Sequence, residues 1–97
     1  MKAVLITYNV AIHTEVLEIL ERLEVEGFTR WERVVGRGRS SGPHLGTHIW
    51  PAYNSALLVV AEDAKVDQLL QNIRTLRQKM AKEGVKAFVL PVLDVTD

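Results

Sequence analysis

Residues 2–8 read KAVLITY, and this stretch decides which class of fold the chain can form. Its apolar and β-branched side chains occupy both sets of alternate positions, with Ala3 and Leu5 in one set and Val4 and Ile6 in the other. Because alternate residues of a strand point to opposite faces of a sheet, both faces of this strand must be buried. We therefore expect a central strand with a neighbouring strand on each side.

Three further segments have strand character. Residues 55–61, SALLVVA, are again apolar on both faces and predict a second central strand. Residues 28–35, FTRWERVV, are more polar and indicate a strand at a sheet edge. Residues 86–95, KAFVLPVLDV, predict the other edge strand, because Pro91 has no N–H to donate to a neighbouring strand.

Two segments between these strands show helical spacing instead. Residues 13–26 predict a helix with glutamates on its wet face, closed by Gly27 in the left-handed conformation. Residues 63–83 predict a longer helix with a basic C-terminal half, ended by Gly84. The apolar stripes of the two helices consist of Val16, Ile19, Leu20 and Leu23 in the first, and Val66, Leu69, Leu70, Ile73, Leu76 and Met80 in the second.

The resulting order of elements is β-α-β-β-α-β, which predicts an α+β fold of the ferredoxin-like kind. We expect one domain over residues 1–97, with a four-stranded antiparallel sheet and both helices on one face. Two helices leave the second sheet face open, although both central strands are apolar on that side too. The sequence therefore predicts an obligate homo-oligomer in which other copies cover this face.

Composition excludes several classes of protein. Twelve basic and twelve acidic side chains give a net charge of zero, which argues against a nucleic-acid partner. The chain has no cysteine, so disulfides and thiolate sites are excluded. Its longest apolar runs, 56–61 and 87–93, are far shorter than the roughly 20 residues of a membrane span, and we recognise no signal peptide. We expect a soluble cytoplasmic protein that is not inserted in a membrane.

Residues 36–51, GRGRSSGPHLGTHIWP, have neither helical nor strand periodicity and predict a long loop between the second and third strands. Long loops in compact domains are often functional. Arg37 and Arg39 stand between glycines, so they suit a phosphate or carboxylate, or they are simply solvated. Trp50 and Tyr53 either contact a partner or ligand, or anchor the loop to the body.

The same loop holds two of the three histidines. His44 and His48 are four positions apart, and His13 would add a third imidazole if the loop folds back towards the first helix. Imidazole suits zinc, copper and nickel, so the pattern indicates a divalent transition metal site. The alternative is that these histidines are polar loop residues without a ligand.

Signals for catalysis are weak. Ser40, Ser41 and Ser55 lie in no recognisable nucleophile elbow, and no histidine has an identifiable acid partner. We therefore expect a protein that is not an enzyme, with a small ferredoxin-like enzyme as the less favoured alternative.

Three segments resemble one known family. Residues 25–29 (VEGFT), 36–39 (GRGR) and 86–95 (KAFVLPVLDV) resemble the VEGMT, GFGR and KIFVLPVEDV segments of the PII signal-transduction family, the nitrogen-regulatory proteins. The segments occur in the same order, and the resemblance covers most of the chain. The trimeric copper-tolerance CutA proteins share this fold and represent the metal-binding alternative.

The resemblance implies a homotrimer whose sheets face inward and whose loop projects to a membrane transporter, an enzyme or a regulator. The partner-binding residues of this loop would be His44, His48, Trp50 and Tyr53. It also implies that ATP, ADP or AMP binds in the clefts between subunits. Carried over by position, the implied effector-binding residues are Gly36, Gly38, Arg39 and Lys86. Ser40 replaces the family's glutamine for magnesium and 2-oxoglutarate, and residues 83–86 replace a longer glycine-rich phosphate loop. These departures indicate a divergent PII-like protein.

Overall fold

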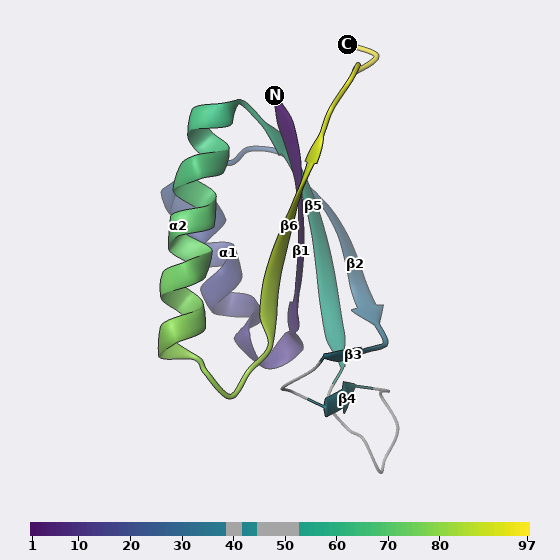
Figure 1. Ribbon diagram of the computed structural model, residues 1–97, viewed down its shortest axis with the longest axis vertical. Coiled ribbons are helices and arrows are strands. Elements are labelled where there is room, and N and C mark those ends of the chain that lie inside the picture. The colour runs from purple at the N-terminus through teal and green to yellow at the C-terminus, as the bar shows by residue number, and fades with distance from the viewer. Residues whose placement is uncertain (39–41, 45–52) are drawn as a thin grey trace.

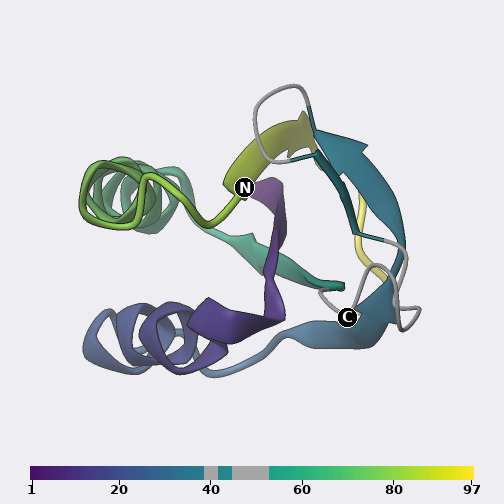
Figure 2. The same cartoon turned by 90° about the horizontal axis from the view of Figure 1, so that it is seen from below.

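The computed structural model describes residues 1–38, 42–44 and 53–97. Four long strands form one antiparallel sheet in the order β2-β5-β1-β6. Their bounds are β1 (Lys2–Asn9), β2 (Thr29–Val34), β5 (Asn54–Ala61) and β6 (Val85–Pro91). Helices α1 (His13–Arg22) and α2 (Asp63–Lys79) both cover the same face (Figure 1; Figure 2). The ferredoxin-like fold is confirmed, with β1 and β5 central and β2 and β6 at the edges.

The core lies between the helices and one face of the sheet. Ile6 pairs with Leu57 of β5 and with Ala87 of β6, so one row of side chains crosses three strands beneath the helices. The apolar stripes of α1 and α2 pack onto this face, as the helical spacing predicts. The fully enclosed members of the core include Val4, Ile6, Tyr8, Val16, Leu57, Val59, Val66 and Leu69.

The C-terminus of α1 differs from the sequence prediction. The helix ends at Arg22, and Glu24, with φ of 57°, adopts the left-handed conformation that we assigned to Gly27. The Glu24 N–H donates to the Glu21 carbonyl at 3.0 Å and the Val25 N–H to the Leu20 carbonyl at 2.9 Å. This pair of bonds is a Schellman motif, in which Val25 turns its side chain back to the core. The core contact of Val25 therefore decides where the helix stops.

The other long elements are shorter than their apolar patterns suggested. Helix α2 ends at Lys79 rather than at residue 83, and β6 ends at Pro91 rather than at residue 95. Residues 92–97 continue beyond the sheet, at the end of the molecule opposite to β3 and β4 (Figure 1). None of the helices that the structure describes is long and apolar enough to cross a membrane.

The stretch predicted as a featureless loop contains regular structure at its base. Strands β3 (Gly36–Gly38) and β4 (Gly42–His44) form a separate two-stranded antiparallel sheet. Residue Arg37 pairs with Pro43 in this small sheet, which lies beyond the ends of β2 and β5 (Figure 1). A short 3-10 helix, η1 (Val10–Ile12), joins β1 to α1 on the same end of the molecule.

The sheet face away from the helices is open in the single chain. Its exposed apolar side chains are Trp31 (47% exposed), Val60 (45%), Phe88 (49%) and Leu90 (45%). Leu5 pairs with Leu58 on one side and with Phe88 on the other, so the apolar row runs across β5, β1 and β6. The uncovered apolar face that the sequence predicts is therefore present.

Candidate functional site

The base of the 36–53 loop and the turn after α2 meet at the end of β1. The Asn9 N–H donates to the Gly84 carbonyl at 2.9 Å, and the Val10 N–H donates to the Tyr53 carbonyl at 3.0 Å. Two neighbouring amides of β1 and η1 therefore hold the end of the loop and the start of β6 together. We refer to this part of the molecule as the loop-bearing end.

The predicted effector residues lie at this end but come from both edges of the sheet. Gly36, Arg37 and Gly38 form β3 directly after β2, whereas Lys86 lies in β6 opposite Thr7. Two strands separate β2 from β6, which corresponds to about 14 Å at the usual strand spacing. The Lys86 side chain is exposed. Arg39 lies outside the described residues.

Tyr53 is tied to the body where the loop returns to the sheet. The guanidinium carbon of Arg33 lies 4.7 Å from the centre of the Tyr53 ring, in a cation–π contact. Together with the carbonyl bond to Val10, this contact favours the anchoring interpretation of Tyr53. The other predicted partner-binding positions divide between His44, which lies in β4, and His48 and Trp50, which lie outside the described residues.

A buried hydroxyl fixes the loop stem. Ser55 is completely buried at the start of β5, and its Oγ donates to the Glu32 carbonyl at 2.6 Å and accepts from Nη2 of Arg30 at 3.2 Å. The pairing of β2 with β5 shifts register between Trp31 and Val34, next to this bond. Ser55 thus supplies a partner for a carbonyl that the irregular ladder leaves free.

His13 faces the same network from the start of α1. Its Nδ1 lies 2.6 Å from the Tyr8 hydroxyl, and the two rings are stacked with centroids 5.7 Å apart and planes 7° apart. Burial raises the pKa of the Tyr8 phenol, with the Arg30 charge opposing, so the phenol keeps its proton, and the tautomer of His13 decides which of the two groups donates. Burial, and then the nearby Arg30 charge, lower the pKa of His13, against the opposing Glu32 carboxylate.

This contact bears on the predicted metal site. Because Nδ1 of His13 is engaged by the Tyr8 hydroxyl, only Nε2 is left for a metal ion. In residues 1–38, 42–44 and 53–97, no three histidine, aspartate or glutamate side chains form a cluster that could hold an ion. His48 lies outside these ranges, so a site combining His13, His44 and His48 stays a prediction.

The sequence did not predict that Tyr8, His13, Arg30 and Ser55 lie together in one polar network. A signal was present in the positions of Arg30 and Ser55, since each puts a polar group into a strand next to apolar neighbours. The alternation alone could not find it, because the network joins four elements that only the sheet topology brings together.

A pocket of about 290 Å³ lies at the opposite end of the sheet. It is lined by Glu24, Val25, Glu26 and Gly27 from the α1–β2 turn, and by Val60, Ala61, Glu62 and Lys65 from the end of β5 and the start of α2. The Lys65 ammonium donates to the Leu23 carbonyl. The pocket therefore has an apolar floor and a mostly acidic rim.

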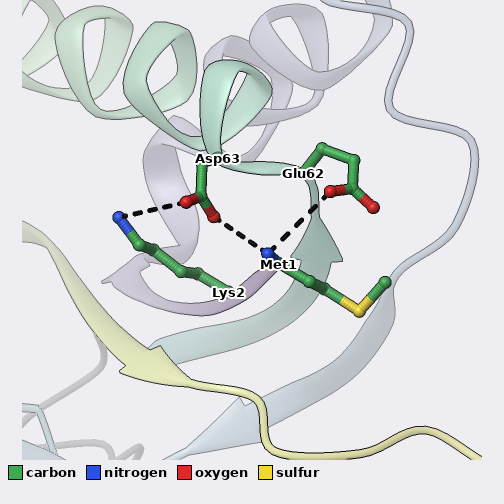
Figure 3. Close-up of polar contacts among 4 residues, drawn as sticks. All are labelled: Met1, Lys2, Glu62 and Asp63. Carbon is green, nitrogen blue, oxygen red and sulfur yellow. Dashed lines mark hydrogen bonds and ion pairs between the residues drawn. The ribbon is translucent and has the colours of Figure 1, made fainter.

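The chain start also lies at this end. The Met1 ammonium is 3.0 Å from Oδ1 of Asp63 and 3.9 Å from Oε2 of Glu62, and Nζ of Lys2 is 3.9 Å from Oδ2 of Asp63 (Figure 3). The hydrogen bond from the ammonium is the main cause that lowers the pKa of Asp63. These exposed ion pairs partly balance the negative charge at the first turn of α2.

The sequence model of the family described as Nitrogen regulatory protein P-II matches residues 1–97. The chain belongs to the PII family. No curated protein matches it. The arrangement of the loop base and the 84–86 turn around the end of β1 is thus a feature of a PII-family chain, and the resemblance found from three short segments is confirmed.

Solved PII-like structures share the fold at low sequence identity. CPII from Thiomonas intermedia K12, bound to ADP, AMP and bicarbonate, is 19% identical, with a TM-score of 0.73 over 94% of this chain and 86% of that one. A PII-like signaling protein from Thermus thermophilus is 23% identical, with a TM-score of 0.63 over 91% and 82%. A DUF3240 family protein from Shewanella baltica is 15% identical, with a TM-score of 0.67 over 99% and 94%.

Proposed function

We propose that this PII-family chain is a cytoplasmic, homotrimeric regulator without enzymatic activity. In this proposal an adenine nucleotide binds at the clefts between copies, and the 36–53 loop acts on a membrane transporter or a regulatory protein. The observation that carries the proposal is the pair of bonds from Asn9 and Val10, because they couple the loop end to the turn before Lys86. A ligand that contacts this turn would thereby reach the loop.

The open sheet face supports the trimer. Trp31, Phe88 and Leu90 together expose a wide apolar surface, and leaving such a surface in water is unfavourable. Burying it against sister copies would also add apolar core to a chain of only 97 residues. The clefts between such copies would lie beside the edge strands β2 and β6, which carry the loop base and Lys86.

Charge supports the loop-bearing end as the place for the phosphates. Arg37 and Lys86 both come from this end, and guanidinium and ammonium groups suit phosphate oxygens. The pocket at the opposite end has Glu24, Glu26 and Glu62 on its rim, and these carboxylates would repel a phosphate. Nucleotide binding by CPII, in its structure with ADP and AMP, supports the same class of effector for this chain.

The nucleotide binds only if the loop base and the start of β6 are intact, and the conformation of the loop then depends on which nucleotide is present. In this proposal the loop has two conformations, and a nucleotide favours the one to which it binds more tightly. The partner then meets mainly that conformation. The choice of partner class follows from the family, in which the loop is the contacting element.

Isothermal titration calorimetry with ATP, ADP and AMP tests the nucleotide part directly. Each titration is run with and without bicarbonate, because the CPII structure holds bicarbonate together with the nucleotides. We expect the double variant Arg37→Gln, Lys86→Gln to weaken binding at least about tenfold, given charge-assisted bonds of about 1.5–3 kcal/mol each. Arg74→Gln with Lys79→Gln, two exposed changes on α2 that remove the same amount of charge, is the matched control and should bind normally. Absence of heat with all three nucleotides would remove this part of the proposal.

A further inference from the structure

The net charge of zero hides a separation of charge along the molecule. We divide the described residues at the level of Leu5, which pairs with Leu58 and Phe88, and midway along each helix. The loop-bearing half carries eight cations and three carboxylates: Arg30, Arg33, Arg37, Arg74, Arg77, Lys79, Lys82 and Lys86, with Glu15, Glu32 and Glu83. The other half carries three cations and nine carboxylates: Lys2, Arg22 and Lys65, with Glu18, Glu21, Glu24, Glu26, Glu62, Asp63, Asp67, Asp94 and Asp97.

The two ends act independently in solution. The longest dimension of the molecule is 43 Å, which is several times the screening length of about 8–10 Å at physiological salt. The C-terminal residues and the small β3–β4 sheet mark opposite ends of this long axis (Figure 1). A charged surface that meets the loop-bearing end therefore encounters an excess of positive charge, and the distant carboxylates contribute little repulsion.

Among the residues that the structure describes at the positive end, few supply the apolar anchors of a protein–protein interface. In the described part of this half, the large exposed apolar side chains are Trp31 and Val35. Trp31 lies on the open sheet face, because it pairs with Ala56 on the same side as Leu58, and the proposed trimer covers this face. Stable protein interfaces use a buried apolar core with aromatic anchors, which Val35 alone does not supply.

The cations are also spread over separate elements rather than gathered in one pocket. Arg74, Arg77 and Lys79 come from the last turns of α2, Lys82 from the turn after it, and Lys86 from β6. These five side chains are exposed. A diffuse layer of exposed basic groups suits the headgroups of an anionic bilayer, where each Lys or Arg near the surface contributes about 1 kcal/mol.

We propose that the loop-bearing end binds the surface of an anionic lipid bilayer by electrostatic attraction, without insertion. The inference rests on the proposed function in one respect. Three copies that pack with their sheets facing inward would present three positive ends to the same plane. Their contributions would then add, because binding of one copy places the others at the surface. A transient attachment to the membrane surface would concentrate the loop where a membrane-embedded partner lies.

Co-sedimentation with vesicles tests the proposal. The probes are vesicles of phosphatidylcholine alone and of phosphatidylcholine with about 30% phosphatidylserine, at low salt and at about 0.5 M NaCl. We expect binding to the anionic vesicles only, and loss of that binding at high salt. Equal partition onto both kinds of vesicle, or binding that survives high salt, would overturn the proposal.

Two pairs of charge variants distinguish the effect of where a charge lies from the effect of the net charge on vesicle binding. Arg77→Gln with Lys82→Gln lowers the charge by two at the loop-bearing end, and should weaken partition onto anionic vesicles about tenfold or more. Gln68→Glu with Thr96→Glu lowers the charge by the same amount at the opposite end, on exposed positions, and should change partition less than about twofold. Equal losses in both variants would show that only the overall charge matters and would contradict the inference.

Two further outcomes are distinguishable. A chain that ignores anionic vesicles but binds immobilised polyglutamate would assign the positive end to an acidic protein surface and overturn the lipid proposal. Sedimentation velocity on the same samples reports the assembly state separately. A protein that is monomeric yet still prefers anionic vesicles would contradict the proposed trimer but not the bilayer inference. A trimer without that preference would contradict the bilayer inference but not the proposed trimer.

Discussion

The Tyr8 hydroxyl and Nδ1 of His13 share a 2.6 Å hydrogen bond, and the two rings lie nearly parallel at the loop-bearing end of the sheet. Protonation of His13 would place a charge in this partly buried site beside the Arg30 charge, and it would leave Nδ1 able only to donate. The contact therefore links the protonation state of one side chain to the packing of η1 and α1 against β1.

The first prediction concerns pH. The pKa of His13 is lowered by burial and by the Arg30 charge, from an ordinary value near 6.5 in the unfolded chain. The unfolded chain then binds more protons than the folded chain between the two pKa values. The free energy of unfolding is therefore unaffected by protonation of His13 above about pH 6.5. It decreases as the pH falls through 6.5 towards the lower pKa of the folded state. Urea unfolding at about pH 7.5 and about pH 5.5, at one protein concentration, measures the difference.

A paired variant isolates His13 from the other titrating groups. His13→Asn keeps an acceptor for the Tyr8 hydroxyl but does not titrate, so the free energy of unfolding should depend less on pH over this range. His44→Ala with His48→Ala removes the two loop histidines and should leave the pH dependence as in the wild type. If the loop variant lost the pH dependence and the His13 variant kept it, His13 would not be its cause.

The second prediction concerns the loop stem. Ser55→Ala removes the partner of the Glu32 carbonyl and one acceptor of Arg30, in a fully buried position. We expect the free energy of unfolding to fall by about 1–3 kcal/mol, which is the usual effect of leaving buried polar groups unpaired. Thr75→Ala is the control, since the Thr75 hydroxyl bonds to the Gln71 carbonyl on an exposed helix face and should matter by less than about 0.5 kcal/mol. Comparable losses in both variants would contradict a special role for Ser55.

The sequence was sufficient for the fold because the decisive features are periodic. The two-sided apolar pattern of residues 2–8 and 55–61 requires central strands, and these are β1 and β5. Element ends were less well predicted, because tertiary contacts set them. Glu24 takes a strained conformation, and Val25 then packs on the core, although Gly27 is the better residue for the turn by intrinsic preference.

The candidate site was predicted in part. Gly36, Arg37, Gly38 and Lys86 do lie at one end of the sheet, which follows from the order of the strands. Their separation across two strands follows from the same prediction, because residues 28–35 and 86–95 were expected at opposite edges of the sheet. The link between His13 and Tyr8, in contrast, was beyond the sequence, since a 3-10 turn at residues 10–12 is needed to bring the imidazole over the phenol.

The third prediction uses the strained end of α1. Glu24→Gly removes the steric cost of a β-carbon at a φ of 57°, and this relief should exceed the added entropy of glycine in the unfolded chain. We expect the free energy of unfolding to rise by about 0.5–1 kcal/mol. Glu26→Gly deletes an equivalent exposed carboxylate, and Glu26 has no positive φ, so that change should be neutral or destabilising. Equal effects of the two changes would count against strain as the cause.

The last prediction tests the open sheet face. Phe88→Glu places a charge on β6 where the side chain is 49% exposed in the single chain, so the folded protomer itself should tolerate the change. In the proposed trimer the same carboxylate would be buried without a partner, which costs enough to prevent assembly. We expect the mass from sedimentation velocity to fall to about a third, with an unchanged far-UV circular dichroism spectrum. Gln71→Glu adds the same charge on the helix-covered side of the molecule, at an exposed position, and should leave the assembly intact. A Phe88→Glu variant that sediments like the wild type would show that β6 is not part of the contact between copies.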